Sequence, residues 1–179
     1  MFNKILVALD DTAMSARILE EALALAKQLN AHLMLLHVLS PVDPHHFGVQ
    51  SGGIGIEGFY PILNEQAVNQ YMKEWRAYEE QGIAQLQGYA RDVAAEGITV
   101  EFTQNVGDPG DVICKIAASW GANLILMGRN RKSGISEIFL GSTSNYVLHH
   151  APCSVLAVQS AVVAQPAKAI DRDLQPVSK

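Results

Sequence analysis

The stretch at 128–142, GRNRKSGISEIFLGS, combines residue types that bind phosphate. Gly128 and Gly141 allow close approach of the backbone to a ligand, and the hydroxyl of Ser142 follows Gly141. The cations in the connecting loop are Arg129, Arg131 and Lys132. The pattern predicts a phosphate cradle, although a strand, a loop and a capped helix occur together in many α/β proteins that bind no phosphate.

The elements on either side of this stretch place its glycines. The apolar run at 123–127, NLILM, predicts a short buried strand, and 143–149 predicts a helix. Gly141 and Ser142 then lie at the start of that helix, where unpaired N–H groups face outward and bind anions. Ser142 is both a candidate helix cap and a hydroxyl donor.

Composition restricts the class of protein. A chain of 179 residues with 49% hydrophobic residues fits a single domain better than two. The net charge of −5 provides no general attraction for nucleic acid or anionic membranes, so an anion site must be built locally. No apolar run approaches a membrane span, and the start, MFNKILVALDD, is not a signal peptide. We expect a cytoplasmic location.

The cysteines and histidines predict no metal site. Cys114 and Cys153 lack the paired spacing of zinc ligands, so we expect reduced thiols that serve packing. The histidine pairs at 45–46 and 149–150 suggest no third ligand, and His37 is expected to be a satisfied core or rim histidine. We name no catalytic residue, because the phosphate-loop, serine-hydrolase and zinc-protease signatures are absent.

Five predicted strands alternate with four predicted helices, which indicates an α/β fold with a parallel sheet. The strands are expected at 3–9, 32–39, 98–105, 123–127 and 154–158. The first helix is expected to end at Asn30, and the third to run from Pro109 to about Trp120 behind an Asp108 cap. Gly121 is expected to stop that third helix.

The second helix is the longest, with an apolar stripe that runs from Val68 to Val93 and loosens at Gly82 and Gly88. The aromatic residues of the stripe, Tyr71, Trp75 and Tyr78, are interpreted as core or subunit interface rather than as a base-stacking platform.

We divide the chain into one domain at 1–160, with a flexible loop at 40–61, and a flexible tail at 161–179. The loop contains Gly53, Gly55 and Gly58, which match the spacing of a dinucleotide fingerprint. That match is interpreted as accidental, because it does not lie between a strand and a helix.

Asp10 and Asp11 follow the first predicted strand, on the rim where open α/β sheets bind ligands. Either acid can serve a ligand, or both can cap the next helix near Thr12 and Ser15. Asp10, the closer to the strand, is our candidate ligand residue.

Four segments together resemble the universal stress protein family: VALDDTAMS at 7–15, LHV at 36–38, GDPGDVI at 107–113 and MGRNRKSGISEIFLGSTSNYVLHHAPCSVLAV at 127–158. The resemblance covers nearly all of residues 3–158. The family pattern is a glycine, two residues, a second glycine, nine residues, and then glycine with Ser or Thr. It falls on Gly128, Arg131, Gly141 and Ser142, so the second glycine is missing.

The resemblance implies a doubly wound, open five-stranded parallel sheet of order 3-2-1-4-5, Rossmann-like, with helices on both faces and a nucleotide cleft where the order reverses. It also implies a homodimer through the last strand, 154–158. The implied ligand is ATP or a related adenine nucleotide, together with Mg²⁺. The residues implied to hold it are Ala8, Leu9, Asp10 and Val38 around adenine and ribose, Met127 and Gly128 near the sugar, Gly141, Ser142 and Thr143 at the phosphates, and Arg129 and Arg131 as loop cations.

Two effects compete at Arg131. If the backbone there is left-handed, a side chain costs about 1 kcal/mol relative to glycine. A guanidinium bonded to phosphate gains about 1.5 to 3 kcal/mol. The comparison favours retained binding. Asn123, which replaces a common Asp of the family, is a second departure.

These expectations favour a dimeric stress sensor rather than an enzyme, in which a bound adenine nucleotide orders the 40–61 loop for an unidentified partner protein. A slow metal-dependent ATPase that uses Asp10 is one alternative. A module of the same fold that has lost the nucleotide is another.

Overall fold

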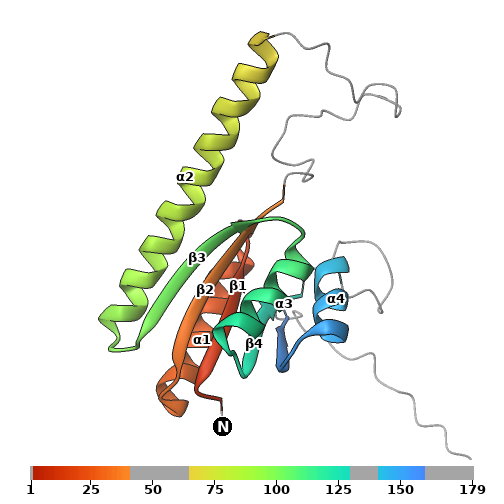
Figure 1. Cartoon of the computed structure of the whole chain (residues 1–179). Helices are drawn as coiled ribbons and strands as arrows, with labels where there is room; N and C mark the ends of the chain where they lie inside the picture. The colour runs from red at the N-terminus through yellow and green to blue at the C-terminus, as the bar shows by residue number, and fades with distance from the viewer. Residues whose placement is uncertain (1, 41–64, 130–140, 160–179) are drawn as a thin grey trace, which may run out of the picture.

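The computed structural model describes residues 2–40, 65–129 and 141–159. Three parts of the sequence predictions lie outside these ranges: Arg131 and Lys132, the 161–179 tail, and all but the first residue of the flexible loop expected at 40–61, with its glycines and histidine pair. The elements are β1 (Lys4–Leu9), α1 (Met14–Leu29), β2 (His32–Leu39), α2 (Glu65–Ala95), β3 (Val100–Val106), α3 (Pro109–Trp120), β4 (Leu124–Gly128), α4 (Ser142–His150) and β5 (Ser154–Val158) (Figure 1).

The five strands form one parallel sheet of order β3-β2-β1-β4-β5. This confirms the predicted fold class and strand order. The bounds of β2, α3 and β5 agree with the sequence expectation, whereas β3 and β4 each begin and end one or two residues later than predicted. These shifts affect only the ends of the strands, which the sequence alone specifies weakly.

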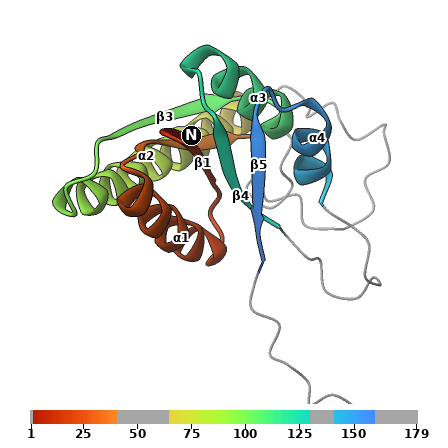
Figure 2. The ribbon, with the colours of Figure 1, turned by 90° about the horizontal axis from the view of Figure 1, so that it is seen from below.

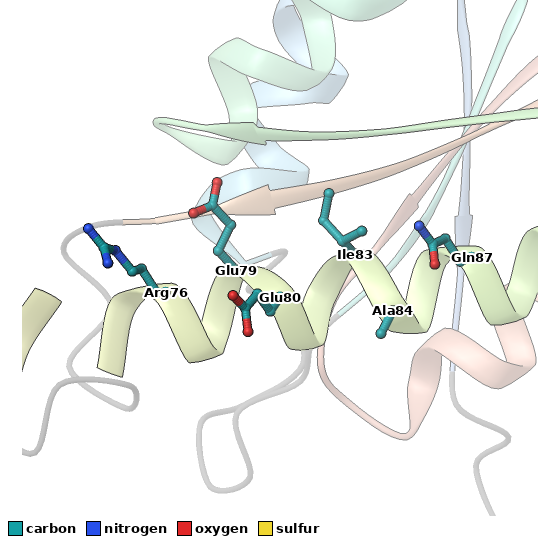
Figure 3. Close-up of a pocket in the computed structure, with 6 residues that line it drawn as sticks. All are labelled: Arg76, Glu79, Glu80, Ile83, Ala84 and Gln87. Atoms are coloured by element: carbon teal, nitrogen blue, oxygen red, sulfur yellow. The ribbon is translucent and has the colours of Figure 1, made fainter. Parts of the chain in front are cut away.

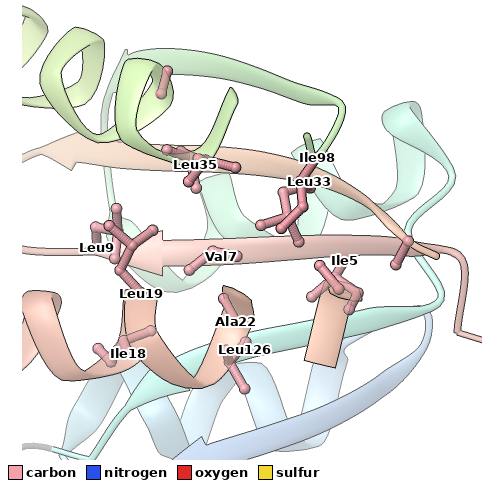
Figure 4. Close-up of a cluster of buried hydrophobic side chains, with 14 of the residues drawn as sticks. Ile5, Val7, Leu9, Ile18, Leu19, Ala22, Leu33, Leu35, Ile98 and Leu126 are labelled. Atoms are coloured by element: carbon pink, nitrogen blue, oxygen red, sulfur yellow. The ribbon is translucent and has the colours of Figure 1, made fainter. Parts of the chain in front are cut away.

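Helices cover both faces of the sheet (Figure 2). On one face, strand residues such as Val7 and Leu35 pack against α1 and α2, and we call this cluster the α1/α2 core (Figure 4). On the other face, residues such as Leu6 and Ile125 pack against α3 and α4 in the α3/α4 core. Side chains alternate along each strand, so neighbouring residues at the sheet rim belong to opposite faces.

Local sequence signals explain several helix ends. Asn30 takes a left-handed conformation (φ 50°) at the end of α1, and its backbone N–H bonds to the Ala26 carbonyl. Asp108 caps α3 through its side chain, and Gly121 ends α3 in a left-handed conformation. These three predicted helix boundaries are confirmed.

Helix α2 differs from the sequence expectation, because it is continuous through Gly82 and Gly88. A Cβ at Gly82 would lie 2.8 Å from the His37 Nδ1 atom and closer still to the Gln104 Oε1 atom. Gly82 therefore makes room for side chains from β2 and β3 and does not loosen the helix. The amino-terminal half of α2 extends past the carboxyl ends of the strands (Figure 1).

Asn123, the second departure from the family pattern, has a structural role at the other end of the sheet. Its side-chain oxygen accepts hydrogen bonds from the backbone N–H groups of Asn3 and Lys4 at 2.9 and 2.7 Å. An amide oxygen and a carboxylate oxygen can both accept such bonds. The change from Asp to Asn therefore keeps the join between the starts of β1 and β4.

Candidate functional site

The sheet order reverses between β1 and β4, and the predicted site lies at this reversal. From β1 the chain crosses through α1 to β2 on one side, while β4 pairs with β1 on the other side. Open parallel sheets bind ligands outside the carboxyl ends of their strands at such a point. The last residues of the two strands, Leu9 and Gly128, mark the position of the candidate site.

Three predicted residues share the face covered by α3 and α4. Ala8 and Val38 are partly buried against the α3/α4 core, and Met127 is buried within it. Ala8 lies beside Met127 in the register of β1 and β4. These side chains form an apolar surface next to the rim, which is the kind of lining that small-molecule sites use.

Leu9 and Gly128 lie differently, because they face α1. Leu9 is buried in the α1/α2 core. A Cβ at Gly128 would lie 2.9 Å from the Ile18 Cδ1 atom and 3.1 Å from the Met14 Cγ atom. Glycine at this position is explained by close packing of α1 on β4, so a ligand at the rim would meet only the backbone of these two residues.

Asp10 organises the turn between β1 and α1. Its Oδ1 atom accepts hydrogen bonds from the Thr12 backbone N–H at 3.1 Å and from the Thr12 hydroxyl at 2.6 Å. The Asp10 backbone N–H donates to the Ser15 hydroxyl at 2.9 Å. These contacts order the turn and fix an exposed carboxylate at the rim, but they do not cap α1, whose N-cap residue is Ala13 and which has no side-chain cap hydrogen bond.

Helix α4 begins at this rim without a side-chain cap. Gly141 is its N-cap residue, no side-chain cap hydrogen bond is present among the described residues, and the first turn contains no acidic residue. Ser142 was predicted as a cap, but it is the first helical residue, so that prediction is wrong. The Ser144 hydroxyl donates to the Gly128 carbonyl at 3.3 Å, which ties the start of α4 to the end of β4.

Arg129 follows β4 and carries an unsatisfied donor. Its backbone N–H bonds to the Val158 carbonyl at 2.9 Å. Its Nε atom is buried and has no hydrogen-bond partner among the residues that the structure describes. A buried donor without an acceptor is uncommon in folded proteins, and an anion is one group that satisfies it.

Contact with α3 sets the position of α4. A Cβ at Gly110 would lie 2.7 Å from the Tyr146 ring, so glycine is required for the two helices to approach this closely. At the other end of α4, His149 and His150 occupy the last turn, where a positive charge is favoured. This placement accounts for the adjacent histidines at 149–150, for which the sequence suggests no third metal ligand.

The other predicted chemical groups serve packing. Cys114 and Cys153 are free and pack against the α3/α4 core. Burial raises the pKa of both thiols, with a smaller contribution from Asp111 at Cys114 and from Cys114 at Cys153. A raised pKa keeps a thiol protonated and unreactive. Within the described ranges, no three His, Cys, Asp or Glu residues are grouped to hold a metal ion.

A pocket lies along α2 (Figure 3). Its described lining comes entirely from one helix and consists of Arg76, Glu79, Glu80, Ile83, Ala84 and Gln87. Its charged groups are one base, Arg76, and two acids, Glu79 and Glu80, all exposed on a single helix, and we assign no ligand to this pocket.

Sequence reasoning missed a polar cluster on the opposite face of the sheet. His37 is buried as expected, but its ring lies near Asp11 from the β1–α1 turn and near Gln104 from β3. Tyr78 of α2 donates to Asp11. The register that sets His37 opposite Gln104 brings together residues distant in sequence, and no local pattern of residue types indicates such a pairing.

Comparisons with known proteins agree with this architecture. The chain matches the model of the Universal stress protein family over residues 1–159. The universal stress protein Sll1388 of Synechocystis is 35% identical over 162 residues, which cover 88% of this chain and 98% of that protein.

Solved structures show the same fold. The structure of MJ0577, a Methanocaldococcus jannaschii protein, has a TM-score of 0.66 at 23% identity and covers 89% of this chain and 97% of its own. An Arabidopsis thaliana universal stress protein family member with AMP bound has a TM-score of 0.56 at 18% identity, covering 93% and 97%. A universal stress protein in complex with cAMP has a TM-score of 0.55 at 19% identity, covering 88% and 97%. Among the described residues of our chain, no helix has both the length and the apolar character needed to cross a membrane.

Proposed function

Since this chain belongs to the universal stress protein family, we propose that it is a stress-response protein that binds an adenine nucleotide at the β1/β4 rim. ATP is the first candidate ligand. The two similar structures that hold AMP and cAMP support an adenine nucleotide as the class of ligand. We further propose that the protein acts as a dimeric sensor in the cytoplasm and not as an enzyme.

The observation that carries this proposal is the unsatisfied donor of Arg129 beside an uncapped helix. The buried Nε atom of Arg129 has no described acceptor, and the first turn of α4 has neither a side-chain cap nor an acid. Both features favour an anion from outside the chain. A hydrogen bond from a guanidinium to phosphate contributes about 1.5 to 3 kcal/mol, less where water reaches it.

The remaining site residues form two groups in the proposed complex. Ala8, Val38 and Met127 supply an apolar surface for the base, while the Leu9 and Gly128 backbone and Asp10 lie next to the sugar. Gly141, Ser142 and Thr143 hold phosphates, and Ser142 is exposed at the start of α4. Mg²⁺ would enter with the nucleotide, held chiefly by phosphate oxygens and water, as Mg²⁺ commonly is in phosphate sites.

A sensor fits the described site better than a catalyst does. Asp10 is the candidate ligand acid at the rim, and its Oδ1 atom already accepts bonds from Thr12. Such a carboxylate fixes a turn and is poorly placed to activate water as a general base. Steady ATP hydrolysis above about 1 per second by the purified protein would contradict a sensor.

The proposed dimer interface is the edge strand β5. It pairs only with β4 in the described sheet, and Leu156 on it is 42% exposed. An exposed strand edge with an apolar side chain is suited to pairing with a second copy. Sedimentation velocity should give the mass of two chains, and the mass of one chain at tens of micromolar would remove the dimer from the proposal.

Calorimetric titration tests nucleotide binding directly. ATP, ADP, AMP and cAMP are titrated with Mg²⁺ into the wild type, Arg129→Gln and Arg129→Lys. We expect submillimolar binding to the wild type and a loss of about 10- to 100-fold in affinity for Arg129→Gln, because the charge-assisted bond is removed. Arg129→Lys keeps the charge and should lose less. Absence of binding to the wild type would refute the proposal, and equal affinity of all three proteins would remove Arg129 from the site.

A further inference from the structure

A buried histidine on β2 lies between two hydrogen-bond acceptors. His37 is 5% exposed and faces the α1/α2 side of the sheet. Its Nε2 atom lies 3.4 Å from the Asp11 Oδ1 atom, and its Nδ1 atom lies 3.2 Å from the Gln104 Oε1 atom. The two partners come from the β1–α1 turn and from β3, so the imidazole bridges two segments distant in sequence.

The orientation of the Gln104 amide is fixed by a second hydrogen bond. Its Nε2 group donates to the Glu79 carbonyl of α2 at 3.0 Å. Turning the amide over would place its oxygen against that carbonyl oxygen, so Oε1 must face the imidazole. Both ring nitrogens of His37 therefore face acceptors. A neutral imidazole has one N–H group, and only the imidazolium has the two donors that this arrangement can use.

Helix α2 closes this cluster from the other side. The Tyr78 hydroxyl donates to the Asp11 Oδ2 atom at 2.9 Å, and the Tyr78 ring meets the His37 ring edge-on with centroids 6.3 Å apart. One helical turn further on, Gly82 lacks the Cβ that would collide with His37 and Gln104. Glycine is unfavourable inside a helix, so its presence here indicates that α2 must lie close to the imidazole.

The charges around His37 favour its protonation. Burial disfavours the imidazolium, but the hydrogen bonds to Asp11 and Gln104 and the negative charges of Asp11 and Asp10 outweigh burial, so the pKa of His37 is raised above 6.5. Among the described residues, the groups from the neighbouring elements are the two acids of the β1–α1 turn, the Tyr78 phenol of α2 and the neutral Gln104 amide of β3.

We propose that His37 is a proton-binding site that fastens α2 to the β1–α1 turn. With the proton bound, the imidazolium donates one hydrogen bond to Asp11 and one to Gln104. Asp11 accepts a further bond from Tyr78, and Gln104 donates one to the Glu79 carbonyl, so both partners are bonded to α2. When the proton leaves, one ring nitrogen presents a lone pair to an acceptor and a buried bond is lost. Because the raised pKa belongs to the folded state, this stabilisation is complete below about pH 6.5 and is lost as the pH rises through the folded-state pKa.

A consequence for the ligand follows from the position of Asp11. Asp11 is next to Asp10, which lies at the rim of the proposed nucleotide site. Loss of the His37 proton should therefore make nucleotide affinity depend on pH. This consequence rests on the proposed function, whereas the proton site itself does not.

Nuclear magnetic resonance of the histidine rings in the full chain, without nucleotide, tests the proton site. At pH 6 we expect both His37 ring nitrogens to carry protons, with a titration midpoint above 6.5 in the wild type and a lower midpoint in Asp11→Asn. His32, at the opposite end of the same strand, is the internal control, and its ring signals should not change in Asp11→Asn. A neutral His37 ring at pH 6, or a midpoint that Asp11→Asn leaves unchanged, would overturn the proposal.

Thermal unfolding provides a second measurement of the same site. The wild type should exceed His37→Gln in Tm at pH 6, and this difference should narrow as the pH rises through the His37 midpoint. A difference that is constant from pH 6 to 9 would indicate packing alone and would contradict a proton-linked role. If His37→Gln does not fold, Asp11→Asn takes its place in this comparison.

Discussion

Helices α3 and α4 both begin at the carboxyl edge of the sheet and pack against each other, yet their first turns are built differently. In α3 the Asp108 side chain accepts the Asp111 backbone N–H at 3.2 Å, Pro109 follows the cap, and Asp111 adds a negative charge. In α4 the cap residue is Gly141, with no side-chain bond and no acid in the first turn. Helix α3 supplies its own anion, whereas the first turn of α4 contains no acid that could do so.

The contrast extends to the charges nearby. The negative charges of Asp108 and Asp111 compensate the positive end of the α3 dipole. The rim near α4 instead carries the buried Nε atom of Arg129, which has no hydrogen-bond acceptor among the described residues. The chain as a whole has a net charge of −5. An anion site on an acidic protein must therefore come from the arrangement of a few groups, and the proposed nucleotide site would use the start of α4 together with Arg129.

The largest effect is expected from making α4 resemble α3. Gly141→Asp places a carboxylate at the α4 cap, where it should bond to the free N–H groups and repel phosphate. We expect ATP affinity to fall by about 100-fold or more, because like charges in contact cost several kcal/mol. Stability should stay the same or rise by a few tenths of a kcal/mol, because Asp caps slightly better than Gly. Calorimetry and thermal melts measure the two effects.

Gly141→Asn is the matched control for this substitution. Asn caps a helix about as well as Asp but carries no charge. Gly141→Asn should retain more ATP affinity than Gly141→Asp, and the ratio of the two dissociation constants isolates the charge. Equal affinities in both variants and the wild type would show that phosphate does not bind at α4, and the contrast between the two helices would lose its functional meaning.

A smaller effect is expected from removing the side-chain cap of α3. Asp108→Ala removes the cap and should destabilise the protein by about 1 kcal/mol, with nucleotide affinity unchanged. Chemical denaturation measures the loss, and Asp108→Asn, which keeps a capping oxygen, should restore most of it. If Asp108→Ala weakened ATP binding as strongly as Gly141→Asp does, both helix ends would belong to one site and the comparison would fail.

The two helix starts also show what could be predicted from the sequence. Asp108 followed by Pro109 is a local signal, and the predicted cap of α3 is confirmed. At α4 the sequence predicted Ser142 as the cap, and the structure shows that the cap residue is Gly141 instead. Strand order came from the family resemblance, because periodicity fixes the elements but not which strands are neighbours.

The unpredicted features all depend on contacts between distant segments. Gly82 looks like a helix breaker in sequence, and only the neighbouring His37 and Gln104 explain it. Gly128 belongs to a glycine pattern associated with phosphate, yet in the structure it admits Ile18 of α1. The residues assigned to the nucleotide remain a prediction that calorimetry tests.

The pairing of β1 with β4 also has a consequence for how the chain folds. The Lys4 backbone is bonded to Asn123, 119 residues away, whereas β1 reaches β2 through a single helix. Long-range pairings close large loops and form slowly, so the first βαβ unit should assemble early and the β1/β4 rim late. During synthesis we therefore expect β1 to keep an open edge until β4 has left the ribosome, and the proposed site to form only after α4 has followed.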